Sequence, residues 1–474
     1  MPYNKLIFDY HKKGRGCSDI NITRELPNKL VSLLRKNELD LPDVSELDVV
    51  RHYTALSRKN FGVETNFYPL GSCTMKYNPK INEKIASFDA FNVHPETPNY
   101  LVQGKLGILF EMSHFLEKIT GFPYFSFSPF AGAHGELTGL MIIKKYFEVK
   151  KQKRNKIIVP DSAHGTNPAS AALAGFEIIQ IKSNERGQID LETLKSVLKK
   201  DVAGIMLTNP NTTGVFEEEI LEISTLVHAN GSLLYYDGAN LNAILGVIRP
   251  SDMGFDVMHI NLHKTFSTPH GGGGPGSGVV GVRDFLKDYL PAPVVVKTND
   301  TYCFSTPKKT IGSVSHFFGN FLVVIKAYAY ILSLGNKIDY VGKLAVLNSR
   351  YLKEGLKDYF IDPLADVPCL HEFVFNGLKN NPNEIRTLDV AKKLLDYGYH
   401  APTIYFPLVF HEAMMIEPTE SENVETLDEF RDSLIEVAKL AVSDPDSLKN
   451  APLTREIKRP DEVLAARKPI LTYK

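Results

Sequence analysis

A lysine between an apolar run and a dense glycine cluster carries the strongest chemical signal in the chain. Lys264 follows the apolar run Val257 to Ile260 and precedes the stretch 271–278, which contains six glycines. Glycines permit positive φ and a close approach of the backbone to a bulky group, which a lysine that forms a Schiff base with a carbonyl cofactor requires. This pattern predicts a lysine that binds a cofactor covalently.

Two phosphate-binding motifs match this segment in letters only. A P-loop needs its lysine after the glycines, whereas Lys264 precedes them. Gly271, Gly273 and Gly276 have the spacing of a dinucleotide fingerprint, but the strand-like run Val279 to Val282 follows where a helix should begin. Both motifs therefore fail on context. A glycine hairpin beside a solvated lysine remains an alternative interpretation of the glycines alone.

A carboxylate follows a second apolar run, 27 residues before the lysine. Asp237 comes directly after Leu233 to Tyr236, and the small residue Ala239 lies two positions further on. Pyridoxal phosphate (PLP) acts as an electron sink only while its pyridine nitrogen is protonated, and a buried aspartate supplies the counter-charge. Asp237 and Lys264 together favour PLP chemistry, with Ala239 against one ring face. Alternatively, Asp237 caps a helix that begins near Ala239.

Three further turns offer groups for the same cofactor. Gly132, Ala133 and His134 lead into a helix-like segment whose free amides could hold a phosphate. His164 follows another apolar run and could stack on the ring, although a lone histidine is more often a structural hydrogen-bonding group. Thr208 opens a turn rich in Asn, Pro and Gly that would lie near the ring hydroxyl, and an ordinary turn is an equal alternative.

A metal site is not expected. His259 and His263 share the i,i+4 spacing of zinc-binding helices, but Ile260 stands where such helices have glutamate. No third ligand accompanies the two histidines in the sequence.

Alternating strand-like and helix-like segments predict how these residues meet. A helix-like stretch from Leu106 to Ile119 closes on Gly121. Apolar runs then alternate with the helix-like segments Leu191 to Leu198 and Glu217 to Ala229; the runs are Lys156 to Val159, Glu177 to Ile181, Val202 to Leu207, Leu233 to Tyr236 and Val257 to Ile260. This order predicts an α/β domain with a mostly parallel sheet that is buried on both faces. Ligands bind outside the carboxyl ends of the strands in such sheets.

The order changes beyond residue 310 and predicts a smaller α+β domain. We expect an N-terminal segment over 1–104, a large cofactor-binding α/β domain over 105–310, and a small domain with a tail over 311–474. The small domain shows a helical stretch, two strand-like runs and a further helix: Phe317 to Leu356, His371 to Phe375, Tyr405 to Phe410, and a helix that ends at Ala441.

Composition excludes several classes of function. The 474 residues carry 54 Lys+Arg against 55 Asp+Glu, so a net charge of -1 gives no reason to expect a nucleic-acid or membrane partner. The longest apolar run, Phe321 to Leu334, is shorter than the roughly 18 residues of a membrane span. Four scattered cysteines form neither a disulfide framework nor a metal knuckle: Cys17, Cys73, Cys303 and Cys369. We therefore expect a cytoplasmic protein.

These residues together resemble the P-protein family, the PLP-dependent glycine decarboxylases of the glycine cleavage system, and in particular the second subunit of forms split into two chains. The resemblance covers nearly the whole chain. Besides the lysine motif, the similar stretches are Glu64 to Pro79, Ala131 to Leu140, Ser162 to Ala172, Leu207 to Glu217, Asp237 to Gly246 and Tyr405 to Glu420. The resemblance implies the α/β fold of aspartate-aminotransferase type (fold type I), which agrees with the predicted alternation.

The resemblance also implies roles for single residues. Lys264 becomes the Schiff-base lysine, Asp237 the partner of the pyridine nitrogen, and His164 the group that stacks on the ring. Three further residues would lie near the phosphate: Ala133, His134 and His263. The implied reaction is decarboxylation of glycine on PLP, followed by transfer of the aminomethyl group to the lipoyl arm of the H-protein. The implied assembly is a heterotetramer with a first glycine dehydrogenase subunit.

One departure from the family and two alternative functions accompany this interpretation. Ser313 and Ser315 stand where the family usually has basic residues, and we assign no catalytic role to Cys73. A simple PLP-dependent amino-acid decarboxylase shares the lysine, aspartate and histidine but lacks the Tyr405 to Glu420 stretch. A non-catalytic partner subunit is the other alternative, and retention of Lys264 disfavours it.

Overall fold

The computed structural model describes residues 5–16, 32–33, 35–37, 39–270 and 276–472. Cys17 and the residues Gly271 to Pro275 of the glycine cluster lie outside the described residues. The chain forms two compact units, Met1–Thr65 and Asn66–Lys474. The domain boundaries expected near residues 104 and 310 stay predictions.

The first unit contains the short 3₁₀ helix η1 (Ile7–Tyr10) and the helix α1 (Glu46–Ser57). The Ser45 hydroxyl begins α1 by accepting a hydrogen bond from the Asp48 amide at 3.2 Å. The Asp43 carboxylate accepts a hydrogen bond from the Gly14 amide at 3.0 Å, and the His11 ring accepts one from the Asp43 amide at 2.7 Å. Polar contacts between side chains and backbone therefore tie the segment after η1 to the start of α1.

A seven-stranded sheet forms the centre of the second unit, in the order β1-β7-β6-β5-β4-β2-β3. Its strands are β1 (Tyr124–Ser126), β2 (Lys156–Pro160), β3 (Glu177–Ile181), β4 (Val202–Leu207), β5 (Leu233–Gly238), β6 (Val257–Asn261) and β7 (Gly278–Val282). The five strands from β3 to β6 run parallel, whereas β7 pairs antiparallel with β6 and with β1. The predicted α/β domain and its five parallel strands are confirmed.

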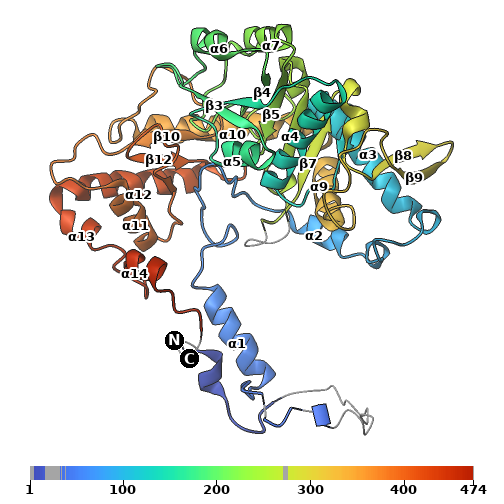
Figure 1. Ribbon diagram of the computed structural model, residues 1–474. Coiled ribbons are helices and arrows are strands. Elements are labelled where there is room, and N and C mark those ends of the chain that lie inside the picture. Colours follow the sequence, from blue (N-terminus) through green and yellow to red (C-terminus); the bar gives the residue numbers. More distant parts are fainter. Residues whose placement is uncertain (1–4, 17–31, 34, 38, 271–275, 473–474) are drawn as a thin grey trace. The chain divides into compact units, whose positions relative to one another are not determined.

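Helices cover both faces of this sheet (Figure 1). Alternate residues of β5 belong to different cores: Tyr236 packs in the core that contains Val323 of α9 (Phe321–Leu334), and Tyr235 in the core that contains Ile142 of α4 (Gly132–Val149). The helices are α3 (Gln103–Thr120), α4 (Gly132–Val149), α5 (Thr166–Leu173), α6 (Leu191–Val197), α7 (Ile220–Ala229), α8 (Leu262–Thr265) and α9 (Phe321–Leu334). Burial on both faces explains why the strands read as unbroken apolar runs.

A three-stranded antiparallel sheet, in the order β10-β12-β11, lies in the C-terminal part of the chain. Its strands are β10 (Phe373–Asn376), β11 (Thr403–Ile404) and β12 (Ala413–Ile416), and its helices are α10 (Asp339–Leu356), α11 (Thr387–Asp396), α12 (Val424–Ser443) and α13 (Pro445–Lys449). Phe373, Phe430 and Leu352 join these elements in one core. An isolated bridge between Leu70 and Ile416 attaches the segment that precedes α2 (Lys80–Ala86) to β12.

Two sequence predictions for this C-terminal part are wrong. Tyr405 to Phe410 is not a strand but the loop between β11 and β12, because Tyr405 has a φ of +56° and Pro407 lacks an amide proton for pairing. The single helical stretch Phe317 to Leu356 is two helices, α9 and α10, and the chain bends by 85° between Lys337 and Asp339. Phe317 and Phe318 precede α9 with positive φ.

No single helix among the described residues is long and apolar enough to cross a bilayer. The segments Phe321–Lys337 and Asp339–Leu356 satisfy the length and composition criterion only as a pair, and that pair is bent by 85°.

Two glycines at opposite ends of α3 should have opposite effects on stability when they are replaced by alanine. Gly121 has a φ of +78°, and an added Cβ would lie 1.9 Å from the Ser251 hydroxyl oxygen, whereas a Cβ on Gly104 meets no atom within 4 Å. We expect Gly121→Ala to lower the free energy of unfolding by about 1–2 kcal/mol, and Gly104→Ala, inside the same helix, to raise it by about 0.5–1 kcal/mol. Denaturant unfolding measures both; equal effects would contradict this account of the helix end.

Candidate active site

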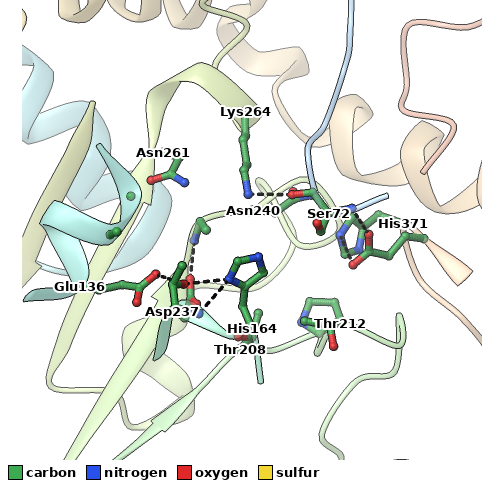
Figure 2. Close-up of a pocket in the computed structure, with 16 residues that line it drawn as sticks. Ser72, Glu136, His164, Thr208, Thr212, Asp237, Asn240, Asn261, Lys264 and His371 are labelled. Atoms are coloured by element: carbon green, nitrogen blue, oxygen red, sulfur yellow. Dashed lines mark hydrogen bonds and ion pairs between the residues drawn. The ribbon is translucent and has the colours of Figure 1, made fainter. Parts of the chain in front are cut away.

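A cavity of about 220 Å³ opens at the carboxyl ends of the parallel strands (Figure 2). It brings together these predicted residues: Gly132, Ala133, His164, Thr208, Asp237, Ala239 and Lys264. It also contains Pro210 and Thr212 from the turn that Thr208 opens, and residues that we did not predict: Ser72, Glu136, Thr166, Asn240, Asn261, His371 and Glu372. In Figure 2, Glu136, Asp237 and Asn261 lie on one side of Lys264, and Ser72 and His371 lie on the other.

Lys264 enters the cavity from the short helix α8, which directly follows β6. Its Nζ donates a hydrogen bond to the backbone oxygen of Ser72 at 2.7 Å. Ser72 belongs to a loop in which Ser72 and Thr74 both have positive φ. The amine therefore points away from the sheet towards a loop that comes from a distant part of the sequence.

Asp237 lies at the end of β5, beside β6, and its side chain is almost fully buried. Its carboxylate accepts hydrogen bonds from Asn167 Nδ2 at 2.8 Å and from the Ala239 amide at 3.0 Å. Burial by itself raises the pKa of Asp237, but His259 and these two donors outweigh burial, so the pKa lies below its ordinary value. No helix begins at Ala239, so the alternative interpretation as a helix cap is wrong.

His259 supports this carboxylate from the neighbouring strand β6. Its Nε2 lies 3.4 Å from Asp237 Oδ1, and its Nδ1 lies 2.8 Å from the Tyr235 hydroxyl oxygen. The ring is fully buried. His263, four residues on, instead accepts a hydrogen bond from the Ser277 amide at 3.3 Å. The two histidines thus belong to different networks.

His164 lies beside Asp237 and below the Lys264 amine in Figure 2. Its Nδ1 accepts a hydrogen bond from the Thr166 amide at 3.2 Å, and the Thr166 hydroxyl donates one to Glu136 at 2.8 Å. Burial, reinforced by Lys264 and partly offset by Asp237, lowers the pKa of His164. A neutral, flat imidazole therefore faces the cavity, as a ring that stacks on an aromatic cofactor should.

One end of the cavity suits an anion. The helix α4 begins at Gly132 without a side-chain cap, which leaves amide protons of its first turn free. The buried Thr208 hydroxyl also has no hydrogen-bond partner, so it can donate to an anion. The predicted phosphate-site residues His134 and His263 do not line the cavity; the His134 ring accepts a hydrogen bond from the Phe130 amide at 3.2 Å.

Two serines at the departure from the family pattern make backbone contacts. The Ser315 hydroxyl donates a hydrogen bond to the Ser128 oxygen at 2.8 Å, and the Ser313 hydroxyl donates one to the Ser315 oxygen at 2.8 Å. They therefore join this loop to the segment that precedes α4.

A wall of the cavity that the sequence analysis missed comes from the residues just before β10. His371 and Glu372 are buried there, and Glu372 accepts a hydrogen bond from the Ser72 amide at 2.8 Å. Burial and the nearby Lys264 lower the pKa of His371 to about 3, so its ring is neutral. The sequence predicted a strand at His371 to Phe375, which corresponds to β10 and the two residues before it. A strand-like run does not show which cavity its first residues reach, so the prediction did not identify this wall.

Comparisons with protein families cover most of the chain. A family model described as "Glycine cleavage system P-protein" matches residues 15–305, and one described as "Glycine dehydrogenase, C-terminal domain" matches residues 341–452. A probable glycine dehydrogenase (decarboxylating) subunit 2 from Caldanaerobacter subterraneus subsp. tengcongensis is 57% identical and covers 99% of both chains. A protein of the same name from Kosmotoga olearia is 56% identical over 92% of this chain and 91% of its own length.

Solved structures share the fold. The crystal structure of a glycine decarboxylase (P-protein) in inhibitor-bound form matches with a TM-score of 0.70 at 19% identity, over 87% of this chain and 93% of that one. A cysteine desulfurase from Thermococcus onnurineus NA1 matches with a TM-score of 0.59 at 15% identity, over 80% and 97%. The predicted fold class, fold type I of aspartate-aminotransferase type, is confirmed.

Buried neutral His371 predicts acid sensitivity. Because its pKa is about 3 in the folded chain and about 6.5 when unfolded, the unfolded chain takes up a proton that the folded chain rejects. The stabilisation is complete above about pH 6.5 and declines as the pH falls towards 3, by up to about 1.4 kcal/mol per pH unit. His371→Asn should flatten the decline of the melting temperature between about pH 6.5 and 5. The exposed control His411→Asn should not; equal slopes in all three proteins would contradict the assignment.

Proposed function

Since the chain belongs to the glycine cleavage system P-protein family, we propose that it is a PLP-dependent enzyme that decarboxylates glycine. One observation carries the proposal: Lys264 and Asp237, which lie at the ends of neighbouring strands, reach the same cavity. The name shared by its relatives, subunit 2, supports a partner subunit 1. We further propose that the aminomethyl group passes to the lipoyl arm of the H-protein.

The residues of the cavity fit PLP. Lys264 would form the Schiff base, Asp237 would face the pyridine nitrogen, and His164 would lie against the ring. The first amides of α4 and the unpartnered Thr208 hydroxyl supply donors for the phosphate and the ring oxygen. When bound, PLP supplies an electron sink for the electron pair left behind as CO₂ departs.

The Asp237 network holds a proton where the sink needs it. Asn167 and the Ala239 amide donate hydrogen bonds to the carboxylate, and His259 lies against it from β6. These contacts keep Asp237 ionised in a buried position, so that the carboxylate can retain a proton on a pyridine nitrogen in front of it. The chain therefore supplies fixed electrostatics rather than a mobile base at this end of the cavity.

The opposite end of the cavity receives the substrate amine. The Ser72 backbone oxygen accepts a hydrogen bond from the Lys264 amine at 2.7 Å, so it would hold this amine beside the glycine amine when the cofactor is bound. The His164 ring packs edge-on against Phe406, with ring centroids 5.4 Å apart. The loop between β11 and β12, which contains Phe406, therefore contacts the histidine ring that faces the cavity.

Exchange of labelled bicarbonate into the glycine carboxyl group tests the function. We expect exchange when this chain is combined with its partner subunit and lipoylated H-protein, and little by the chain alone. Asp237→Asn should slow exchange by about 10²–10³-fold, because a neutral amide cannot hold the proton on the sink. Asp284→Asn, which changes an exposed carboxylate paired with Lys287, should not.

Three results would contradict the proposed function. They are exchange by Asp237→Asn at the wild-type rate, strong exchange by this chain alone, and release of free methylamine as the main product. The last result would instead support a simple decarboxylase.

A further inference from the structure

We propose that Glu372 and Glu417 form a carboxyl pair that holds one proton beside Lys264 and donates it to the sulfur released during aminomethyl transfer. The proposal rests on the proposed function and assigns a further catalytic role within it. Glu372 lines the cavity, and Glu417 lies behind it at the end of β12. Neither residue has a role in holding the cofactor.

The two carboxyl groups are close and buried. One oxygen of Glu372, one of Glu417 and one ring nitrogen of His371 all lie within 4.8 Å of one another. Glu372 is 3% exposed and Glu417 is 0% exposed. Two carboxylates at this separation in a buried site resist ionising together, because each charge disfavours the other and water does not screen them. The geometry therefore favours one proton shared by the pair.

Hydrogen bonds divide the pair into an anchored and a free member. Glu417 accepts hydrogen bonds from the Thr74 amide at 3.0 Å, the Thr74 hydroxyl at 2.7 Å and Asn240 at 2.9 Å. Glu372 accepts one from the Ser72 amide at 2.8 Å. Since donors favour the ionised form, Glu417 is the better carboxylate and Glu372 the better site for the proton.

The surrounding charges agree with this division. Burial raises the pKa of Glu372 well above its ordinary value, with a further rise from Glu417 and a partial offset from Ser72 and Lys264. Burial also raises the pKa of Glu417 and that of the neighbouring Cys73 thiol. The titratable groups that face the pair are therefore Lys264, Cys73 and His371.

His371 gives an independent sign that this wall faces a reacting group. Its ring is 2% exposed, neither ring nitrogen has a hydrogen-bond partner, and it lines the same cavity as Lys264. Its Nε2 lies 3.6 Å from Glu372 Oε1. A buried polar ring of this kind without a partner costs free energy unless a ligand or a proton satisfies it.

The proposed reaction needs one proton at this place. Loss of CO₂ leaves an electron pair on the glycine carbon, which forms a C–S bond with one sulfur of the lipoyl disulfide as the S–S bond breaks. The electron pair of the S–S bond stays on the second sulfur as a thiolate. Glu372 donates its proton to that thiolate, and the pair takes up a replacement from solvent. The lipoyl disulfide is the oxidant, and the balance needs no other reagent.

Ser72 connects this acid pair to the cofactor lysine. Its oxygen accepts the hydrogen bond from Lys264, and its amide donates one to Glu372. In Figure 2, Ser72 and His371 lie together beyond the Lys264 amine. A disulfide that reaches the reacting carbon near Lys264 therefore finds the acid on the same side of the cavity.

Infrared difference spectra of the cofactor-free full chain test the shared proton directly. Glutamate ordinarily loses its proton near about pH 4.3. The wild-type protein should retain the C=O band of a protonated carboxyl group at pH values well above this. Glu372→Gln should remove this band, whereas Glu417→Gln, which removes the neighbouring negative charge, should leave the proton on Glu372 and lower the pH at which the band disappears. The matched control is Glu217→Gln, because Glu217 is also buried but does not line the cavity. Its substitution should leave the band of the pair in place.

Single turnovers of the complete complex with lipoylated H-protein test the proton transfer. Glu372→Gln should slow the appearance of the lipoyl thiol by about 10²-fold or more, a much larger effect than on the release of labelled CO₂ in the same turnover. The wild-type transfer rate should fall as the pH rises through the pKa of the pair, because the donor loses its proton, and the variant should lack this decline. Glu372→Asp, which can still ionise, should retain it.

Several outcomes would overturn the proposal. They are wild-type transfer rates in both Gln variants, a carboxyl band that Glu217→Gln removes instead, and a divalent cation that elemental analysis finds in the purified chain but not in Glu372→Gln. Failure of the wild-type complex to release CO₂ from glycine would instead overturn the proposed function. The two failures are therefore distinguishable.

Discussion

The site depends on the burial of one carboxylate, Asp237, at the end of β5. An isolated carboxylate at this depth would be protonated, since removing its charge from water costs several kcal/mol. The structure prevents this with Asn167 from α5, the Ala239 amide and His259 from β6, and Tyr235 in turn contacts His259. Each contact requires the register of β5 and β6 and the position of α5. The sheet therefore holds the negatively charged Asp237 carboxylate in a fixed position.

A second set of buried polar contacts joins distant parts of the sequence around the lysine. Lys76 is buried, donates a hydrogen bond to the Thr265 oxygen at 2.7 Å and pairs with Glu420 at 2.6 Å. Thr74, in the same loop as Lys76, donates a hydrogen bond to Glu417, which follows β12. The loop therefore contacts both α8, which contains Lys264, and the chain after β12. Loss of one charged partner would leave the other buried and unpaired, so we regard this loop as part of the site.

The sequence was sufficient to predict the parallel strands and to place Asp237 and Lys264 at their carboxyl ends. Asp237 and Lys264 each follow an apolar strand, and parallel strands end at the same edge. The pair Glu372 and Glu417 was not predictable in the same way, because Glu372 precedes an antiparallel strand and Glu417 follows another. No periodicity shows that both bind the loop that contains Ser72 and Thr74. Tyr405 to Phe410 failed as a strand for a local reason, the φ of +56° at Tyr405. Short apolar runs cannot reveal such a backbone angle.

Borohydride reduction of the protein loaded with PLP, followed by peptide mapping, tests the central claim most directly. The account places a single cofactor between Lys264 and Asp237, so the reduced adduct should be found on Lys264, and Lys264→Ala should show none. Lys76 is the informative comparison, because it is buried nearby but already paired with Glu420. An adduct on Lys76 or on any lysine other than Lys264 would contradict the account.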